Sequence, residues 1–290
     1  MTNDSVTADK LRQKVRQGYS EISKKGVFSV VDSSCCSTVG GGCCGGEDFD
    51  VETLVSQIGY SQSELKDLPE SANMGLSCGN PTTLASLKEG EVVLDLGSGG
   101  GFDVFISGPK VGAGGKVIGV DMTPEMISKA RDNSKIYSER TGLNNVEFRL
   151  GEIEHLPVAD NSIDVVISNC VLNLSPDKLQ VWKEISRVLK PGGRVSVSDL
   201  ALRKPLPTKV TEMIDALVGC IAGASLIDDI KQDATKAGFK NISISEKSNY
   251  IETLISFEDP LYQKVLEAMP EGTKLSEYIT SADITAELGQ

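Results

Sequence analysis

Cysteine offers the most distinctive chemistry in this sequence, and the spacing of its seven cysteines divides them into two groups. Four lie as two adjacent pairs in the glycine-rich stretch SSCCSTVGGGCC, residues 33–44. The other three, Cys78, Cys170 and Cys220, stand alone and far apart. An odd number of cysteines in a chain without an export signal favours thiols, metal or metalloid ligands, or redox groups over a disulfide framework.

The composition limits the kinds of protein and partner to consider. A chain of 290 residues with 39% apolar content can form one large core and a smaller added unit. The first residues, MTNDSVTADK, lack a basic and apolar export signal, and no apolar run approaches the roughly 18 residues of a membrane helix. We therefore expect a soluble, cytoplasmic protein with no membrane partner. A net charge of -12 argues against nucleic acid, whose binding needs clustered Lys and Arg, and favours a small ligand.

Short apolar runs alternate with helix-like segments from Glu91 onward. The runs are EVVLDL, KVIGVDM, VEFRLG, SIDVVISN and RVSVSDL. This alternation is typical of βαβ units around a parallel sheet, so we expect an α/β fold. We divide the chain into an N-terminal helical extension with a cysteine-rich loop at 1–70, a central domain at 71–200 and a smaller C-terminal α+β unit at 201–290.

Three helices bear on the cysteines. Apolar residues four apart from Leu11 to Tyr19 predict an amphipathic helix near the N-terminus. Asn80 and Pro81 have the residue types of a helix start, which would follow Cys78 directly. An apolar stripe that includes Cys220 predicts a helix over 209–222.

The glycine loop in LDLGSGGGFDV follows the first expected strand and predicts a site where the backbone approaches a ligand closely. A dinucleotide fingerprint that begins at Gly97 and Gly99 would require a small residue at position 102, where Phe102 argues against NAD. The next strand ends at Asp121, which lies where a carboxylate can accept the hydroxyl protons of a ribose. A merely solvated aspartate at a strand end is the alternative.

The strand ends together carry a resemblance. Asp95, LDLGSGGG, GVDM and GEIEHLP resemble the motifs of class I S-adenosylmethionine-dependent methyltransferases, which implies a Rossmann-like sheet over about residues 90–200 and S-adenosylmethionine as cofactor. The resemblance implies that the glycine loop meets the methionine part of the cofactor, the second strand end the ribose, and the third the adenine. The residues expected to bind the cofactor are Asp95, Gly97, Ser98, Gly99, Gly101, Asp121, Met122, Glu152, Ile153 and Asn169.

Each lone cysteine also has a simple structural explanation. Cys220 fits an apolar helix face, and Cys170 fits a packed strand end. Cys78, before a helix start, lies where a thiolate is favoured. Considered together, three thiolates suit a soft trivalent centre, whereas zinc would usually take a fourth ligand. The single histidine, His155, is expected to be structural, so the methyl acceptor would be one that needs no base.

The three cysteine motifs LSCGNP, SNCVLNLSPDK and VGCIAGA resemble those of arsenite S-adenosylmethionine methyltransferases, over about residues 60–227. The resemblance implies that Cys170 and Cys220 hold arsenite and methylated arsenicals, and that Cys78 joins them in binding and redox turnover. It also implies stepwise methylation, with thioredoxin or a small thiol as reductant. Some relatives have an aromatic residue where Leu76 stands and an acidic residue where Gly219 stands.

Two other functions stay open from the sequence. One is a methyltransferase for carbon or oxygen acceptors of a small molecule, in which the cysteines are only buried. The other is a metalloid-binding protein without turnover.

The resemblance further implies an N-terminal cysteine that forms a disulfide with Cys78 during turnover, and we expect Cys35 or Cys36 in this role. Replacing one of these two cysteines with serine should then impair the later methyl transfers. Replacing Cys43 or Cys44 with serine should affect arsenite capture or nothing measurable. Each single variant is assayed for first and later methyl transfers. Four variants with normal progress curves would reject the expectation.

Overall fold

The computed structural model describes residues 3–25, 59–213, 220–247, 249–256 and 260–289. Its centre is one mixed sheet with the strand order β3-β2-β1-β4-β5-β8-β7 and a short β6 beside β5. The strands are β1 Val92–Leu96, β2 Lys116–Asp121, β3 Val146–Leu150, β4 Ile163–Asn169, β5 Leu189–Leu202, β6 Ser225–Leu226, β7 Phe239–Lys247 and β8 Ile279–Leu288. The first six strands pair in parallel, and β8 is antiparallel to both β5 and β7. The expected α/β architecture with a largely parallel sheet is confirmed.

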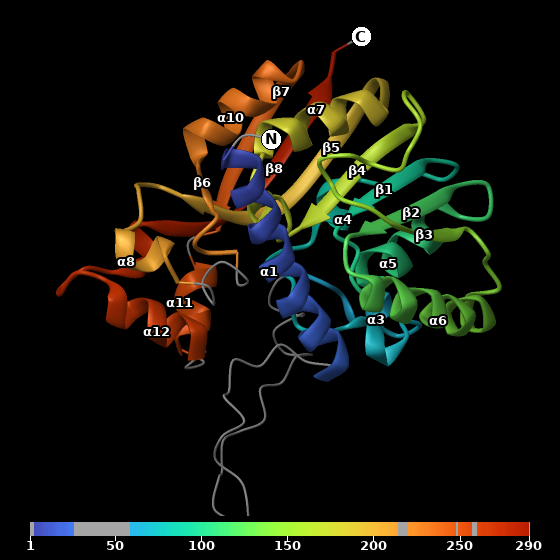
Figure 1. Cartoon of the computed structure of the whole chain (residues 1–290). Coiled ribbons are helices and arrows are strands. Elements are labelled where there is room, and N and C mark those ends of the chain that lie inside the picture. Colours follow the sequence, from blue (N-terminus) through green and yellow to red (C-terminus); the bar gives the residue numbers. More distant parts are fainter. Residues whose placement is uncertain (1–2, 26–58, 214–219, 248, 257–259, 290) are drawn as a thin grey trace, which may run out of the picture.

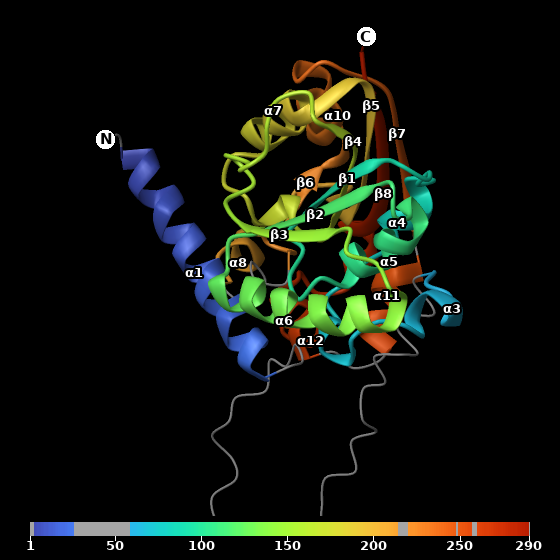
Figure 2. The same ribbon diagram turned by 90° about the vertical axis from the view of Figure 1, so that its right-hand side faces the viewer.

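Helices cover both faces of this sheet (Figures 1 and 2). The larger helices are α1 Asn3–Lys25, α5 Phe102–Val111, α6 Pro124–Thr141, α7 Lys178–Val188, α10 Ile227–Lys236, α11 Asn249–Ser256 and α12 Pro260–Ala268. The shorter ones are α3 Gln62–Leu65, α4 Pro81–Leu84 and α8 Thr208–Thr211, with single 3-10 turns at Glu70–Ala72, Leu172–Leu174 and Leu275–Glu277. Central strands covered on both faces carry continuous apolar runs, which explains sequences such as VVLDL in β1.

Three apolar cores follow from this arrangement. One face of the sheet packs on α7 and α10, where the Trp182 and Phe239 rings meet edge to face with their centroids 5.4 Å apart. The other face packs on α5 and α6 around Phe105 and Tyr137. A third core lies beyond the carboxyl ends of the strands, between α1, α8, α11 and α12, and it contains Cys78, Cys170 and Cys220. The lone cysteines therefore share one apolar environment.

The start of α4 confirms the expected helix signal after Cys78. The side chain of Asn80 accepts a hydrogen bond from the backbone N–H of Thr83, and Pro81 is the first helical residue. This cap fixes where the chain leaves the loop that carries Cys78.

The continuous helix expected over 209–222 is contradicted at the described residues 212, 213 and 220, which are not helical. Helix α8 ends at Thr211, and Cys220 lies in a turn with φ of 62°. A left-handed backbone at Cys220 is incompatible with a continuing right-handed helix. The apolar stripe reflects burial in the third core, because Cys220 and Ile221 are both buried there.

The C-terminal part of the chain contributes to the same sheet as the central part. Strands β7 and β8 extend it beyond β5, and α11 packs against β8. The division of the chain at residues 70 and 200 stays a prediction. Among the described residues, no helix is long and apolar enough to cross a membrane.

Candidate functional site

An open cleft of about 710 Å³ lies at the carboxyl edge of the parallel strands, where ligands of such sheets bind. Its lining combines the ends of β1, β2 and β4 with the loop after β3 and with α1. The lining residues are Arg12, Tyr19, Leu76, Gly97, Gly99, Asp121, Met122, Thr123, Ile153, Glu154, Asn169, Cys170, Val171, Leu174 and Ser175.

The glycine loop gives the cleft a backbone floor. Gly97 and Gly99 have φ of 70° and 51°, in the left-handed region that favours glycine. A Cβ at position 97 would stand 2.2 Å from a Cγ atom of Val171, so the close approach of the loop to the residues after β4 requires glycine. A side chain there would displace Val171, which also lines the cleft.

Asp121, at the end of β2, is fixed by two backbone donors. Its carboxylate accepts hydrogen bonds from the N–H of Gly99 at 3.0 Å and from that of Thr123 at 2.8 Å. Burial raises its pKa, and these two hydrogen bonds oppose that shift. Each carboxylate oxygen retains a second lone pair, which suits the two hydroxyl groups of a ribose. The glycine floor and this carboxylate together fit an adenosyl cofactor.

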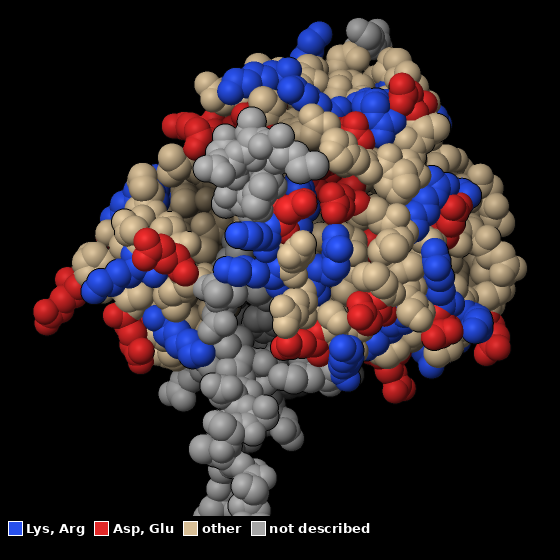
Figure 3. All heavy atoms as spheres, viewed as in Figure 1, with Lys and Arg blue, Asp and Glu red and all other residues tan. Residues whose placement is uncertain are grey.

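Helix α1 forms one wall of the cleft and packs against α6. Arg12 pairs with Glu154 at 3.2 Å and with Glu152 at 3.7 Å, and Arg16 pairs with Glu152 at 3.1 Å, so three ion pairs join α1 to the loop after β3. Acidic and basic side chains are interspersed on the face that α1 crosses (Figure 3). The N-terminal helix therefore covers the loop that the sequence assigns to adenine.

The structure brings only part of the predicted cofactor set to the lining of the cleft. Gly97, Gly99, Asp121, Met122, Ile153 and Asn169 line it. Asp95, Ser98, Gly101 and Glu152 do not line it, and Asp95 and Ser98 are buried beneath the loop. Burial, with Asp103 and Asp121 nearby, raises the pKa of Asp95 well above its usual value. The individual roles of these residues stay predictions, and Arg12, Tyr19 and Glu154 are lining residues that the sequence did not indicate.

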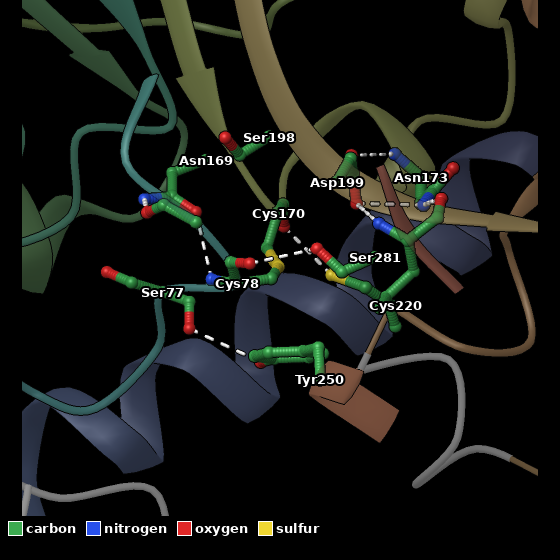
Figure 4. The surroundings of a disulfide bond; sticks show 12 residues. Ser77, Cys78, Asn169, Cys170, Asn173, Ser198, Asp199, Cys220, Tyr250 and Ser281 are labelled. Carbon is green, nitrogen blue, oxygen red and sulfur yellow. Dashed lines mark hydrogen bonds between the residues drawn. A yellow bond between two sulfur atoms is a disulfide. The ribbon is translucent and has the colours of Figure 1, made fainter. Parts of the chain in front are cut away.

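The three lone cysteines converge at one end of this cleft (Figure 4). Cys78 and Cys170 are linked by a disulfide, with their Cα atoms 6.1 Å apart. The thiol of Cys220 donates a hydrogen bond to the carbonyl oxygen of Cys170 at 2.8 Å. All three side chains are buried, and Cys170 also lines the cleft. The cysteine cluster and the cleft therefore meet at Cys170.

The observed disulfide differs from the pairing that the resemblance implies. The resemblance joins Cys78 to an N-terminal cysteine, whereas the structure joins Cys78 to Cys170. Cys35 and Cys36 lie outside the described residues, as do Cys43 and Cys44. Their redox role stays a prediction.

Asn169 has a positioning role that the sequence did not indicate. Its side-chain oxygen accepts a hydrogen bond from the N–H of Cys78 at 3.0 Å, and its amide nitrogen donates to the carbonyl of Gly79 at 2.9 Å. The same nitrogen contacts Asp103 at 3.0 Å and the Tyr60 hydroxyl at 3.1 Å. This amide fixes the loop of Cys78 against the strand end that precedes Cys170.

Asp199, on β5, is a buried carboxylate beside the cysteines (Figure 4). One of its oxygens and the sulfur atoms of Cys78 and Cys170 all lie within 4.8 Å of one another. Burial raises the pKa of Asp199 to about 7, while hydrogen bonds from backbone groups and the nearby Lys178 oppose the shift. The signal available in the sequence was a charged residue in the otherwise apolar run RVSVSDL, which the strand interpretation did not use.

Cys220 is held as a neutral thiol by its surroundings. Burial raises its pKa well above the usual value, and the charge of Asp199 adds to this effect. A hydrogen bond with Tyr19 and the charge of Lys178 act in the opposite direction. Tyr19 belongs to α1, so the N-terminal helix reaches both the cleft and the cysteine cluster.

Replacing Gly97 with alanine tests the backbone floor. The left-handed φ costs alanine about 1–2 kcal/mol, and the added Cβ collides with Val171. We expect Gly97→Ala to weaken the binding of S-adenosylhomocysteine by more than about tenfold, measured by calorimetry, since tenfold corresponds to about 1.4 kcal/mol. Gly114→Ala is the matched control, because a Cβ there meets nothing within 4 Å. Equal affinities of the two variants would contradict the role of the floor.

Replacing Tyr60 with phenylalanine tests the network around Asn169. The Tyr60 hydroxyl donates to Asp103 at 2.6 Å, and this bond favours the ionised carboxylate, whose pKa burial raises to about 6. We expect Tyr60→Phe to lower the free energy of unfolding by about 1–3 kcal/mol when Asp103 is charged.

The raised pKa of Asp103 sets the pH dependence of this effect. Its protonated form is favoured in the folded state, so the associated stability is present below the unfolded pKa of 3.8 and is lost as the pH rises through about 6. The hydrogen bond from Tyr60 reduces that loss, and the cost of Tyr60→Phe in urea unfolding should therefore be larger well above pH 6 than below it. Tyr278→Phe, which retains the ring beneath Lys204, is the control. A cost independent of pH would contradict this account.

Comparisons with known proteins agree with this geometry. Residues 87–238 match the model of the methyltransferase domain family. An arsenite methyltransferase of Halobacterium salinarum is 43% identical over 98% of this chain and 69% of its own length. An arsenite methyltransferase of Mus musculus is 40% identical over 51% of this chain, and the match spans 40% of the mouse protein.

Solved structures agree as well. The crystal structure of CrArsM, an arsenic(III) S-adenosylmethionine methyltransferase from Chlamydomonas reinhardtii, has a TM-score of 0.57 at 30% identity and covers 83% of this chain and 73% of that one. Phosphoethanolamine N-methyltransferase 2 of Haemonchus contortus, in complex with S-adenosyl-L-methionine, has a TM-score of 0.58 and covers 83% of this chain and 60% of that one. Its identity of 18% supports the fold alone. With its glycine-floored cleft and its cysteine cluster, the chain belongs to the arsenite methyltransferase family.

Proposed function

We propose that the protein transfers methyl groups from S-adenosylmethionine to trivalent arsenic, giving methyl- and dimethylarsenicals. The observation that carries this proposal is that Cys170 belongs both to the lining of the cleft and to the cluster with Cys78 and Cys220. A substrate bound by these cysteines would lie at the edge of the cofactor cleft. We infer that methylation of arsenite by this protein serves detoxification and takes place in the cytoplasm.

Arsenite binding needs thiols, so the disulfide between Cys78 and Cys170 must first be reduced. Two electrons and two protons from a dithiol, such as thioredoxin, or from two small thiols convert the disulfide to two thiols. Three cysteine thiols then replace the three hydroxyl groups of arsenous acid, and each exchange forms one As–S bond and releases one water. The thiol proton leaves on that water, so the exchange requires no net change in charge.

The residues of the cleft supply orientation. The floor at Gly97 and Gly99 and the carboxylate of Asp121 would hold the cofactor, while Arg12 and Tyr19 close the wall opposite. When bound, the cofactor would supply an electrophilic methyl group on a sulfonium sulfur, which the arsenic lone pair would take without loss of a proton, leaving S-adenosylhomocysteine. Positioning therefore supplies much of the rate. After the transfer the arsenic is formally pentavalent, so two electrons from the dithiol or small-thiol reductant would return it to the trivalent state before a second transfer.

This chemistry agrees with the groups around Cys170. Two buried acidic side chains near the cluster, Asp199 and Asp103, have pKa values raised by burial to about 7 and about 6. Both carboxyl groups accept hydrogen bonds from neighbouring donors, Asp199 from Asn173 and Asp103 from Tyr60. These bonds hold both carboxyl groups in place, and a methyl transfer without a base needs neither of them to take a proton.

The experiment combines the reduced protein, arsenite and methyl-labelled S-adenosylmethionine, and separates the products by chromatography. We expect labelled methylarsenical first and labelled dimethylarsenical later. Cofactor binding without any labelled arsenical would overturn the proposal. Protection of three cysteines from alkylation by arsenite, without product, would identify a metalloid-binding protein. No protection would favour another methyl acceptor.

Serine at each lone cysteine tests the assignment of ligands. Cys170→Ser and Cys220→Ser should each lower turnover by more than about 100-fold. This exceeds the usual effect of losing a residue that only hydrogen-bonds to a metal ligand. Cys220 does not line the cleft, so Cys220→Ser should retain the affinity for S-adenosylhomocysteine. Normal turnover in either variant would remove that cysteine from the arsenic site.

A further inference from the structure

We propose that the reduced pair Cys78 and Cys170 forms, with Asp199, a binding site for a soft divalent cation of the zinc group. The two sulfur atoms and one carboxylate oxygen lie within 4.8 Å of one another. A tetrahedral ion that holds sulfur at about 2.3 Å and oxygen at about 2.1 Å separates its ligands by roughly 3.4–3.8 Å. Reduction of the disulfide frees the two sulfur atoms to move apart to this separation, and rotations of the three side chains then complete the site.

The donor set distinguishes this site from the proposed arsenic site. Trivalent arsenic takes three sulfur ligands in that proposal, with Cys220 as the third. A zinc-group cation accepts a mixed set of thiolate and carboxylate ligands, with water in the fourth position. The cation site therefore uses Asp199 in place of Cys220, and it forms without the cofactor.

Asp199 is oriented as metal-ligating carboxylates are. Its Oδ1 atom accepts a hydrogen bond from the side-chain amide of Asn173 at 2.8 Å and from the N–H of Leu200 at 2.8 Å. Its Oδ2 atom accepts a longer bond of 3.3 Å from the N–H of Asn173. Such outer hydrogen bonds fix the direction of a carboxylate and increase the affinity for the metal.

The two thiolates and the carboxylate of the reduced, ionised site carry negative charge, which favours a cation. Cys78, Cys170 and Asp199 are exposed by only 2%, 8% and 2%, so their ionised forms are shielded from water. Lys178 contributes a nearby positive charge, and burial lowers its pKa. A divalent cation that displaces the two thiol protons compensates the buried negative charge directly.

A bound cation excludes two other states of Cys78 and Cys170, namely the disulfide and the arsenite complex. The disulfide removes both sulfur ligands, so the cation requires the reduced protein. Reduction adds two electrons and two protons, which a phosphine supplies with water as it becomes the phosphine oxide. Because arsenite would use the same two thiols, the cation competes with arsenite and inhibits methylation.

The test uses Cd²⁺ as the probe, because thiolate ligation gives a charge-transfer absorption in the ultraviolet. The full chain carries serine at Cys35, Cys36, Cys43 and Cys44, which leaves only the three lone cysteines. After reduction by a phosphine, this protein is titrated with Cd²⁺ without cofactor. We expect one bound ion per chain and no binding to the oxidised protein.

Matched variants identify the third ligand. Asp199→Asn should weaken Cd²⁺ binding by more than about tenfold. Tenfold is the smallest usual effect of losing a residue that only hydrogen-bonds to a metal ligand, and Asp199 would be a ligand itself. Asp233→Asn is the control, because Asp233 lines the same small cavity as Asp199 and Lys178 but is absent from the cation cluster. Cys220→Ser should bind Cd²⁺ as the parent does.

A second measurement applies even if Asp199→Asn does not fold. At a urea concentration that exposes the buried thiols, bound Cd²⁺ should protect Cys78 and Cys170 of the parent from alkylation and leave Cys220 reactive, as mass spectrometry would detect. Unchanged affinity in Asp199→Asn, or loss of binding in Cys220→Ser, would overturn the cation site. Either result would leave arsenic methylation standing, because that assay does not depend on Asp199 as a ligand.

Discussion

The side-chain amide of Asn169 is the interaction on which the cysteine site depends. Its oxygen holds the N–H of Cys78, and its nitrogen holds the carbonyl of Gly79. Cys170 is the next residue in the chain, so a single side chain fixes two segments 91 residues apart in sequence. The same nitrogen contacts Asp103 on α5, which connects the cysteines to the helix that follows the glycine loop. An amide that is satisfied on both atoms favours one geometry, because each lost hydrogen bond costs free energy.

The sequence predicted the parts of the fold that depend on local pattern. Strands β1 to β5 were visible because parallel strands buried on both faces need continuous apolar runs. The glycine loop and the start of α4 at Asn80 and Pro81 were visible because their backbone geometry selects particular residue types. The role of Asn169 was not visible, since its partners come from segments distant in the chain. Asp199 was missed for a related reason: its importance comes from the sulfur atoms beside it.

The continuous helix expected up to residue 222 fails at Cys220 for a physical reason that applies beyond this segment. Apolar periodicity reports burial on one side of a chain, and any buried segment can imitate a helical face over a few residues. Cys220 occupies the left-handed region with φ of 62°, and Cys170 does so with φ of 55°. A residue with a β-carbon pays about 1–2 kcal/mol there. Cys170 and Cys220 share this cost, which persists only where the surrounding structure holds the residue in place.

Cys170 shows why these strained positions matter to the chemistry. Its backbone N–H donates to the carbonyl of Ser198 at 2.8 Å, and its own carbonyl accepts the thiol of Cys220 at 2.8 Å. The backbone is therefore fixed on both sides while the sulfur is free to change partners. The disulfide uses that sulfur now, and the proposed arsenic and cation sites would each use it in a different bond. A main chain fixed at the end of β4 would let one buried sulfur change its partner while the cleft beside it keeps its shape.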